Sequence, residues 1–254
     1  MAVLQNARLS DGRQVDLVVD GGHITAIHDA GEAPDADQAV DDLGGWLLLP
    51  AMAEPHAHLD KALTAEKVPN PTGDLLGAID AWISAAAAGM FTHEDTVERA
   101  AAAMELLLVH GVTLVRTHVN VMGDNQTKAL RAVVEAAERF EGLLEVQTVA
   151  LTSSPITGPE GAANRAALTA AIDEGVGYVG GCPHLDPDGP GLIRQAIEIA
   201  TDAGIGIDLH VDEMLDPNVL TLRDLACRVI DAGFAGPVAA SHCVTLGMQP
   251  PQVQ

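Results

Sequence analysis

Histidine is the residue type whose placement in this sequence points most directly to chemistry. Six of the ten histidines stand at the ends of short apolar stretches that are typical of β-strands: His56, His58, His118, His184, His210 and His242. Helix-like stretches separate these strands at a nearly constant interval. Imidazoles gathered at one end of a parallel barrel make a metal site, and a site of this kind usually activates water.

The segment Glu54–Lys61 carries two of these histidines. Proline keeps the residue before it extended, and residues two apart in an extended segment point to the same side. His56 and His58 are therefore expected to project together into the mouth of a barrel. An isolated H-x-H pair is a weak signal, but apolar strands ending in His210 and His242 offer further ligands, which favours a metal site over structural histidines.

From Ala51 onward, strand and helix patterns alternate along the chain. The strands are predicted at 51–54, 112–118, 144–151, 178–181, 205–210 and 238–242. The helices are predicted at 74–90, 93–110, 126–141, 160–174, 190–203 and 218–232. Thr92 and Asp95 have the spacing of a capping box. Glycines that cap helix C-termini follow five of the helices, at intervals of 29 to 33 residues: Gly111, Gly142, Gly175, Gly204 and Gly233.

This alternation predicts an α/β fold, with a parallel sheet covered by helices. A doubly wound open sheet is the alternative, but its first strand is normally followed by a glycine-rich phosphate loop, and this sequence has none there. We therefore expect a (β/α)8 TIM-like barrel over residues 51–254, present only through about strand six. Residues 1–50 are predicted to form a small β segment, with strands at 17–19 and 46–49 and a loop at 30–42.

Composition limits the partners that the chain can have. It contains 13 basic and 36 acidic residues, a formal net charge of −23, which disfavours binding to nucleic acid or to an anionic membrane. No apolar run approaches the roughly 18 residues of a membrane span, and residues 1–20 lack the apolar segment of a secretion signal. The three cysteines show no paired spacing, which suits a reducing cytoplasm.

Five short segments together resemble bacterial cytosine deaminase and its relatives in the amidohydrolase superfamily. They occur in the family's order between about residues 46 and 250: Glu54-Pro-His-Ala-His-Leu-Asp60, Val115-Arg-Thr-His-Val119, Gly181-Cys-Pro-His184, His210-Val-Asp-Glu213 and Ser241-His242. Residues 1–50 resemble, more weakly, the small β-domain that flanks the barrel in that family. The resemblance implies a barrel of the metal-dependent hydrolase type.

The resemblance also implies a role for each matching residue. His56, His58 and His210 would bind one divalent metal ion, zinc or iron(II), while Glu213 would move a proton from the attacking water to a ring nitrogen. His242 would hold and polarise that water. The chemistry of the residues agrees, because three imidazoles leave an open metal position, where the pKa of bound water falls to ~7. The alternative for Glu213 is a solvated acid at the start of a helix.

One metal ion is favoured over two. Binuclear members of the superfamily bridge their metals with a modified lysine after the fourth strand, and the segment Gly180–His184 contains no lysine. His118 and His184 are also expected at the barrel mouth, where they would either bind substrate or anchor loops. A separate group of zinc deaminases uses a P-C-x-x-C signature, which this sequence lacks.

Two positions depart from the cytosine deaminase pattern. Alignment places Ser153 where those enzymes carry a glutamine that recognises the pyrimidine amide edge, and a single hydroxyl cannot replace that paired donor and acceptor. Relatives that act on amino-triazines or other cyclic amidine-like molecules fit equally well. The family's aspartate after an eighth strand has no counterpart before Gln254, so we expect the chain to be a truncated product or a fragment of a longer protein.

The sequence therefore predicts a metal-dependent amidohydrolase that cleaves an exocyclic C–N bond of a small nitrogen heterocycle. Two alternatives stay open: a non-catalytic metal-binding fragment, and a ring-amide hydrolase of the same superfamily. The expected partner is the small heterocyclic substrate, without nucleic acid or membrane, and homo-oligomerisation is left open.

Overall fold

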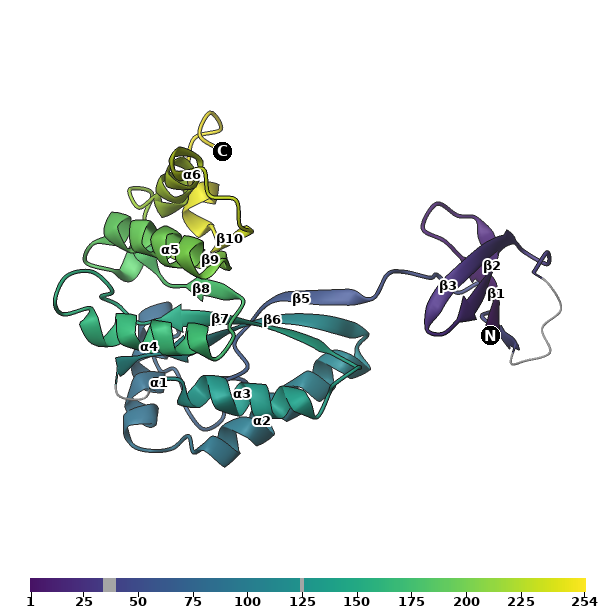
Figure 1. Ribbon diagram of the computed structural model, residues 1–254, viewed down its shortest axis with the longest axis horizontal. Coiled ribbons are helices and arrows are strands. Elements are labelled where there is room, and N and C mark those ends of the chain that lie inside the picture. Colours follow the sequence, from purple (N-terminus) through teal and green to yellow (C-terminus); the bar gives the residue numbers. More distant parts are fainter. Residues whose placement is uncertain (34–39, 124–125) are drawn as a thin grey trace. The chain divides into compact units, whose positions relative to one another are not determined.

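The structure, a computed structural model, describes residues 1–33, 40–123 and 126–254 (Figure 1). The chain divides into two compact units, Met1–Ala51 and Met52–Gln254. Each unit has a sheet of its own, so we describe them separately.

The first unit is a four-stranded sheet in the order β3-β2-β1-β4. Its strands are β1 (Ala2–Arg8), β2 (Gln14–Asp20), β3 (His23–Asp29) and β4 (Val40–Asp42). Strands β1, β2 and β3 pair antiparallel, while β4 runs parallel to β1. Ala7, Val15 and Leu17 form its small buried core. The strand predicted at 17–19 lies within β2.

The strand predicted at 46–49 is wrong. Only Leu47 forms an isolated bridge, to Arg8. The Trp46 carbonyl oxygen accepts the N–H of Arg8 and the N–H of Leu48 donates to the Arg8 carbonyl oxygen, so in the described residues this segment pairs with one residue and not along a strand. The loop predicted at 30–42 ends in β4, and its residues 34–39 lie outside the described part of the chain.

The second unit alternates strands with helices. Its six strands are β5 (Met52–Ala57), β6 (Val112–Val121), β7 (Glu145–Thr152), β8 (Tyr178–Gly180), β9 (Gly206–Val211) and β10 (Val238–His242). The α-helices are α1 (Leu75–Ala87), α2 (His93–Val109), α3 (Lys128–Glu138), α4 (Ala162–Asp173), α5 (Gly189–Ala203) and α6 (Thr221–Ala232). In the described residues, the 3-10 helices η2 (Pro183–Leu185) and η3 (Val244–Met248) follow β8 and β10.

These strands form one parallel sheet in sequential order, β5-β6-β7-β8-β9-β10. Helices pack outside it: α3 lies on β6, α4 on β7 and α5 on β8. The predicted α/β barrel, present through its sixth strand, is confirmed. Because the order runs from β5 to β10 without a return, these two strands are the edges of the sheet in the described residues.

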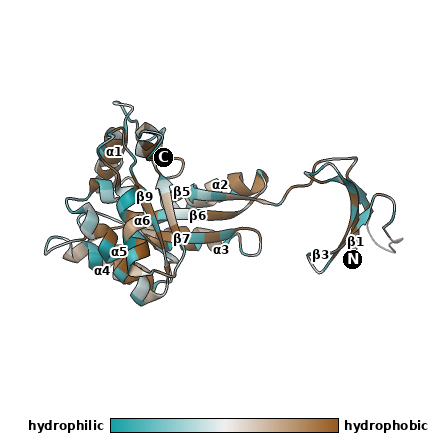
Figure 2. Ribbon diagram, turned by 90° about the horizontal axis from the view of Figure 1, so that it is seen from above, coloured by the Kyte–Doolittle hydropathy of each residue, from teal (hydrophilic) through white to brown (hydrophobic). Residues whose placement is uncertain are grey.

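Local sequence explains where the helices begin and end. The Thr92 hydroxyl accepts the backbone N–H of Asp95 at 3.1 Å and caps α2, as the capping-box spacing predicts. Gly204 and Gly233 end α5 and α6 in the left-handed conformation, which costs glycine least. In Figure 2, helices α4 and α5 carry both hydrophilic and hydrophobic residues, as expected of helices with one face on a sheet.

Strand β6 is longer than predicted. It continues past His118 to Val121, because Val119 and Val121 are buried and pair with Ala150 and Thr152 of β7. His118 therefore lies inside the strand and not at its end.

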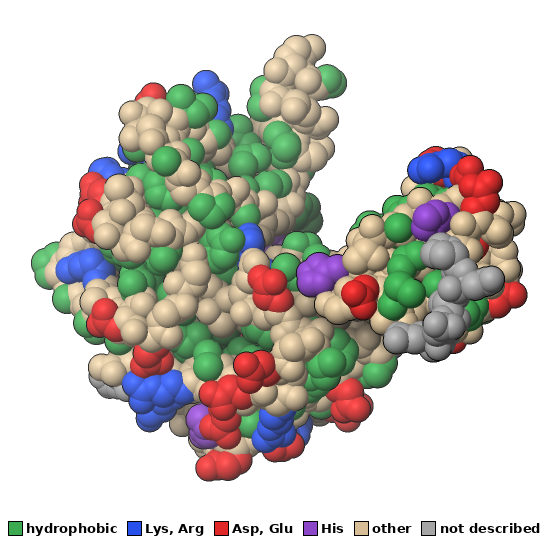
Figure 3. Space-filling view, turned by 45° about the vertical axis from the view of Figure 1, so that its right-hand side comes forward, with side chains coloured by type: hydrophobic (Ala, Val, Ile, Leu, Met, Phe, Trp, Pro, Cys, Tyr) green, Lys and Arg blue, Asp and Glu red, His purple; other side chains and the backbone are tan. Residues whose placement is uncertain are grey.

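The core of the second unit is aliphatic and lies between the sheet and its helices. Leu168, Leu192, Ile207 and Leu209 are among its fully buried members. On the face drawn in Figure 3, hydrophobic side chains reach the surface between acidic and basic ones. None of the helices in the described part of the chain combines the length and apolar character that a membrane crossing needs.

Candidate metal centre at the ends of the strands

Five imidazoles meet where four strands of the second unit end. The five are His56, His58, His118, His210 and His242, carried by β5, the residue after it, β6, β9 and β10. The ring centroid of His56 lies 4.4 Å from that of His118 and 4.8 Å from those of His210 and His242. That of His58 lies 5.2 Å from His210. The sheet thus brings together residues almost 190 positions apart.

Several ring nitrogens in this cluster are buried without a protein partner. They are Nε2 of His56, both nitrogens of His118 and Nδ1 of His210; Nε2 of His184, outside the cluster in η2, is also buried without a partner. Buried polar atoms are nearly always hydrogen-bonded in folded proteins. Unpartnered ring nitrogens that converge from several strands therefore fit a bound ion.

One pair in the cluster has the spacing of two ligands of one ion, and one triad is more loosely grouped. The Nε2 atoms of His58 and His210 lie 3.2 Å apart. Two nitrogens bound at about 2.0–2.1 Å to one tetrahedral ion would be separated by about 3.3 Å. In addition, His56, His210 and His242 each offer a ligand atom within 4.8 Å of the others. His210 thus belongs to both groupings.

The buried rings are neutral, which is the form that binds metals. Burial lowers the pKa of His58 to about 3, and the charge of Lys61 adds to the shift. Burial together with the neighbouring rings lowers the pKa of His118 to about 2. Burial also lowers the pKa of His56 and of His210.

Lys61 is held beside the cluster by other residues. Its Nζ donates to Asp60 Oδ2 at 2.9 Å and to Asn120 Oδ1 at 2.8 Å. Nζ lies farther, 3.4 Å, from Nδ1 of His58. Lys61 thus joins Asp60, in the loop after β5, to Asn120 of β6, and it is also within hydrogen-bond distance of the His58 ring.

Asp212 and Glu213 follow β9 directly, and their roles differ. Asp212 is fully buried and accepts the N–H of Thr221 at 2.5 Å and that of Leu222 at 3.1 Å, so it caps helix α6. Glu213 instead lies 3.5 Å, carboxylate to Nε2, from His242. Burial raises the pKa of the Glu213 carboxyl. The charge of His242 lowers that pKa and offsets part of the increase. Of the two acids, Asp212 is used by the helix cap, whereas Glu213 faces His242 of the cluster.

The other predicted residues lie around the cluster. His184 is in η2, where its Nδ1 lies 3.1 Å from the His210 carbonyl oxygen. Ser153 follows β7, is half-buried, and donates its N–H to Val121. His118 is fully buried between His56 and His210.

Sequence reasoning missed three polar residues that contact the histidines or each other. Asp208 and Arg116 form an ion pair of 3.1 Å, and the Ser241 hydroxyl lies between Asp208 and His56. A signal for two of them was available. Asp208 and Arg116 each stand two residues before a cluster histidine, and residues two apart share one face of a strand.

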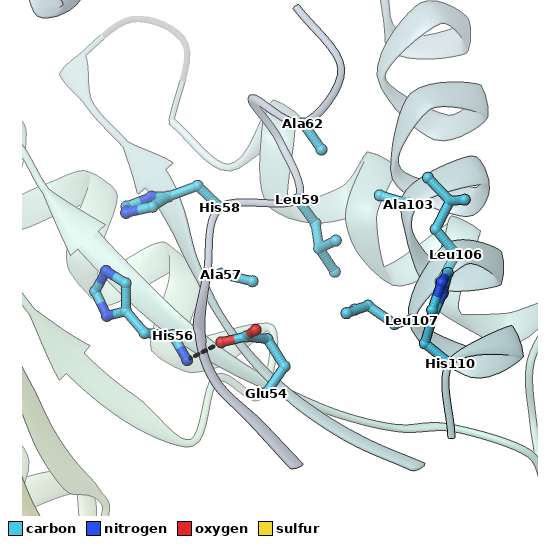
Figure 4. Close-up of a pocket in the computed structure, with 10 residues that line it drawn as sticks. All are labelled: Glu54, His56, Ala57, His58, Leu59, Ala62, Ala103, Leu106, Leu107 and His110. Carbon is cyan, nitrogen blue, oxygen red and sulfur yellow. Dashed lines mark hydrogen bonds between the residues drawn. The ribbon is translucent and has the colours of Figure 1, made fainter. Parts of the chain in front are cut away.

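A hollow of about 390 Å³ lies beside the cluster, on the other side of β5. Figure 4 shows the rings of His56 and His58 pointing one way from the backbone, while Leu59 points the other way, toward Leu106 and Leu107 of α2. This hollow is largely apolar, and His56 and His58 are among the residues that line it.

The chain belongs to the amidohydrolase family, whose model matches residues 47–244. It is 34% identical over 236 residues to pterin deaminase of Rhizobium rhizogenes, covering 93% of this chain and 53% of that protein. The structure of 5-methylcytosine deaminase from Klebsiella pneumoniae with 5-fluorocytosine is similar at a TM-score of 0.88 and 32% identity. It covers 98% of this chain and 60% of that one.

A third relative extends the chemistry of the group. The structure of N-isopropylammelide isopropylaminohydrolase from Burkholderia multivorans is similar at a TM-score of 0.80 and 26% identity, over 99% of this chain and 63% of that one. The chain therefore spans between half and two thirds of the length of these relatives.

Proposed function

We propose that this chain carries the metal-binding half of a hydrolase that removes an amino or alkylamino group from a small nitrogen heterocycle. The observation that carries the proposal is the convergence of buried, neutral imidazoles with unpartnered nitrogens beside the carboxylate of Glu213. The named substrates of the three relatives, pterin, 5-methylcytosine and N-isopropylammelide, support a heterocyclic substrate class.

We assign one divalent ion, zinc or iron(II), to His56, His58 and His210. The 3.2 Å spacing of the His58 and His210 nitrogens supports this set. The orphaned Nε2 of His56 supports it as well. When bound, such an ion acts as a Lewis acid that lowers the pKa of water to ~7. The alternative set replaces His58 by His242.

Glu213 is the proton carrier in this proposal. Water adds to the sp² carbon that bears the amine, so a C–O bond forms while the ring C=N bond accepts a proton. Glu213 takes that proton from the water and gives it to the ring nitrogen. It then takes the second proton of the water and gives it to the leaving amine as the C–N bond breaks. A carboxyl group whose pKa is raised by burial suits this alternation.

His242 orients the water and holds Glu213 in place. Its Nε2 lies 3.5 Å from the Glu213 carboxylate, and its ring adjoins those of His56 and His210. His184, in η2, and Ser153, directly after β7, are half-buried, which supports contact with the substrate. His118 is fully buried among the other rings, which supports an anchoring role over substrate contact.

We place the protein in the cytoplasm, on the basis of its three free cysteines. Its formal net charge of −23 supports a small-molecule partner over nucleic acid or an anionic membrane surface.

The test is ammonia or amine release from a panel of aminopterins, aminopyrimidines and alkylamino-triazines, with the chain loaded with Zn²⁺ or Fe²⁺. Turnover should fall by about 10²–10⁴-fold in Glu213→Gln while metal content stays near one ion per chain. Glu66→Gln, an exposed acid in the loop after β5, is the matched control and should keep turnover. Undiminished release from Glu213→Gln would overturn the role of Glu213.

The same experiment separates the alternatives. Ring opening without released ammonia or amine identifies a ring-amide hydrolase. Stoichiometric metal without turnover on any substrate overturns the enzymatic proposal for this chain and favours a metal-binding fragment.

A further inference from the structure

Three polar side chains form a continuous hydrogen-bonded chain beneath the histidine cluster. The Ser241 hydroxyl oxygen lies 3.0 Å from Nδ1 of His56 and 3.1 Å from Oδ1 of Asp208. His56 belongs to β5 and Ser241 to β10, the two edges of the sheet. The sheet therefore curls far enough for its edge strands to share a side-chain contact.

The hydrogen atoms available to these side chains allow one arrangement of donors and acceptors. A serine hydroxyl has a single hydrogen, whereas an ionised carboxylate only accepts. Ser241 must therefore donate its hydrogen to Asp208. Its oxygen is then an acceptor toward His56, so Nδ1 of His56 must carry the ring proton. The other ring nitrogen, Nε2, is left as a lone pair.

Asp208 is itself held so that it cannot turn away. Its Oδ2 accepts from Nη1 of Arg116 at 3.1 Å, and the Asp208 side chain is almost completely buried. The Arg116 guanidinium lies 3.9 Å from the ring centroid of Tyr178 and donates to Gln147 Oε1 at 2.9 Å. One carboxylate oxygen is thus committed to Arg116, and the other faces the Ser241 hydroxyl at 3.1 Å and Nε2 of His118 at 3.6 Å.

The candidate metal site requires a ring nitrogen of His56 with a free lone pair. Nε2 of His56 is buried and has no protein partner. We infer that Ser241 and Asp208 are positioning residues, which fix the tautomer and the orientation of His56 so that its Nε2 is presented to the metal ion. The inference rests on the proposed metal site, and extends it to two residues that touch neither metal nor substrate.

The first test compares two substitutions at Ser241. Ser241→Ala removes the acceptor of the His56 proton, whereas Ser241→Thr keeps the hydroxyl. Affinity for Zn²⁺ and Co²⁺ is measured by competition with a chelator, using the full 254-residue chain. We expect Ser241→Ala to bind about 10–100-fold more weakly, the usual effect of losing such a partner, and Ser241→Thr to restore affinity to within about threefold of the parent chain. Equal affinities in all three proteins would overturn the inference.

The second test uses Asp208→Asn to reverse the direction of the hydrogen bonds between Asp208, Ser241 and His56. Arg116 requires an acceptor, so the amide oxygen faces Arg116 and the NH2 group faces Ser241. Ser241 must then donate to Nδ1 of His56, which moves the ring proton to Nε2 and blocks the metal-binding nitrogen. Asp208→Asn is therefore expected to bind metal more weakly than Ser241→Ala.

A double variant that combines Ser241→Ala with Asp208→Asn distinguishes this relay of hydrogen bonds, from Asp208 through Ser241 to His56, from a purely structural role. Without Ser241, the amide introduced at position 208 has no route to His56, so the double variant should match Ser241→Ala and not fall below it. Independent structural damage would instead add the two losses. Thermal unfolding of each metal-free variant checks that it is folded. If Asp208→Asn fails to fold, the Ser241→Ala and Ser241→Thr pair decides the inference.

Failure of the inference and failure of the proposed function give different results. Turnover with unchanged metal affinity in Ser241→Ala overturns the relay alone. If the variants show the expected order of metal affinities but no protein shows turnover, the relay is supported and the proposed function is overturned. A parent chain that binds no Zn²⁺ or Co²⁺ overturns both.

Discussion

The Nε2 atoms of His58 and His210 lie 3.2 Å apart, although the two residues are 152 positions apart in the chain. His58 follows β5 and His210 is near the end of β9. Their spacing matches two ligands of one tetrahedral ion, and it also permits a hydrogen bond between neutral rings. Substitution of His58 distinguishes a shared metal ion from a hydrogen bond between the two rings.

We predict that His58→Ala lowers affinity for Zn²⁺ by more than about 100-fold, because it removes one of three direct ligands. His242→Ala should lower affinity by less than about tenfold while abolishing turnover, since His242 acts on the water. Chelator competition and a turnover assay on the same preparations provide the comparison. His110→Ala, at the exposed end of α2, is the control. A larger loss in His242→Ala would transfer the third ligand position from His58 to His242.

The adjacent acids Asp212 and Glu213 should separate stability from activity. Asp212→Asn keeps the side-chain shape and tolerates the left-handed backbone at this position, but loses part of the cap on α6. We expect a loss of about 1–2 kcal/mol in the free energy of unfolding. Glu213→Gln should leave that free energy unchanged or higher, because it removes a partly buried charge. Urea unfolding of the two metal-free variants measures both, and the reverse ranking would contradict the assignment.

Much of this architecture could be predicted from residue patterns, because its signals are local. The Thr92 cap and the glycines after α5 and α6 depend on neighbouring residues, and they mark helix ends where the structure has them. The strand predicted at 46–49 failed for the opposite reason. Trp46 and Leu47 have strand-like composition, but pairing partners, which lie elsewhere in the sequence, decide whether an extended run becomes a strand.

The candidate site was predictable in type but not in its connections. Histidines at strand ends indicated a metal centre, whereas the contact between His56 and Ser241 joins the two edge strands and depends on how far the sheet curls. Asp208 could be placed on the face of His210 by alternation along β9. Its partners Arg116 and Ser241 lie on β6 and β10, and a pattern within one strand cannot identify them.

Gly206 makes room for the ring that supports Arg116. A Cβ atom at this position would overlap the Cδ1 and Cε1 atoms of Tyr178, whose ring stacks on the guanidinium. We predict that Gly206→Ala destabilises the chain by about 1–3 kcal/mol, the usual cost of overpacking. In a Tyr178→Ala background, where the ring is absent, the same Gly206→Ala change should cost less than in the parent chain, measured by urea unfolding. Gly247→Ala, where no atom lies within 4 Å of the added methyl, is the control.

Asp95 ties the start of α2 to the loop that follows His58. It accepts from Arg99 at 2.7 Å, and Arg99 in turn donates to the carbonyl oxygens of Asp60 and Ala62. Partial burial raises the pKa of Asp95, but hydrogen bonds and charge from Lys67 and Arg99 outweigh it and leave that pKa below 3.8. A lowered pKa means that the unfolded chain takes up this proton first as the pH falls.

The contribution of Asp95 to stability should therefore be complete above about pH 4 and diminish as the pH falls through its folded-state pKa. We predict that Asp95→Asn destabilises the chain by about 2 kcal/mol at pH 6, the value of a hydrogen bond to a charged group. The difference between variant and parent should shrink toward pH 3, as the parent's carboxylate protonates. Glu98→Gln, on the same helix with an exposed carboxylate bound to Arg139, should leave the midpoint of unfolding unchanged. A penalty for Asp95→Asn that stays constant from pH 6 to pH 3 would show that this carboxylate acts through its shape and not through its charge.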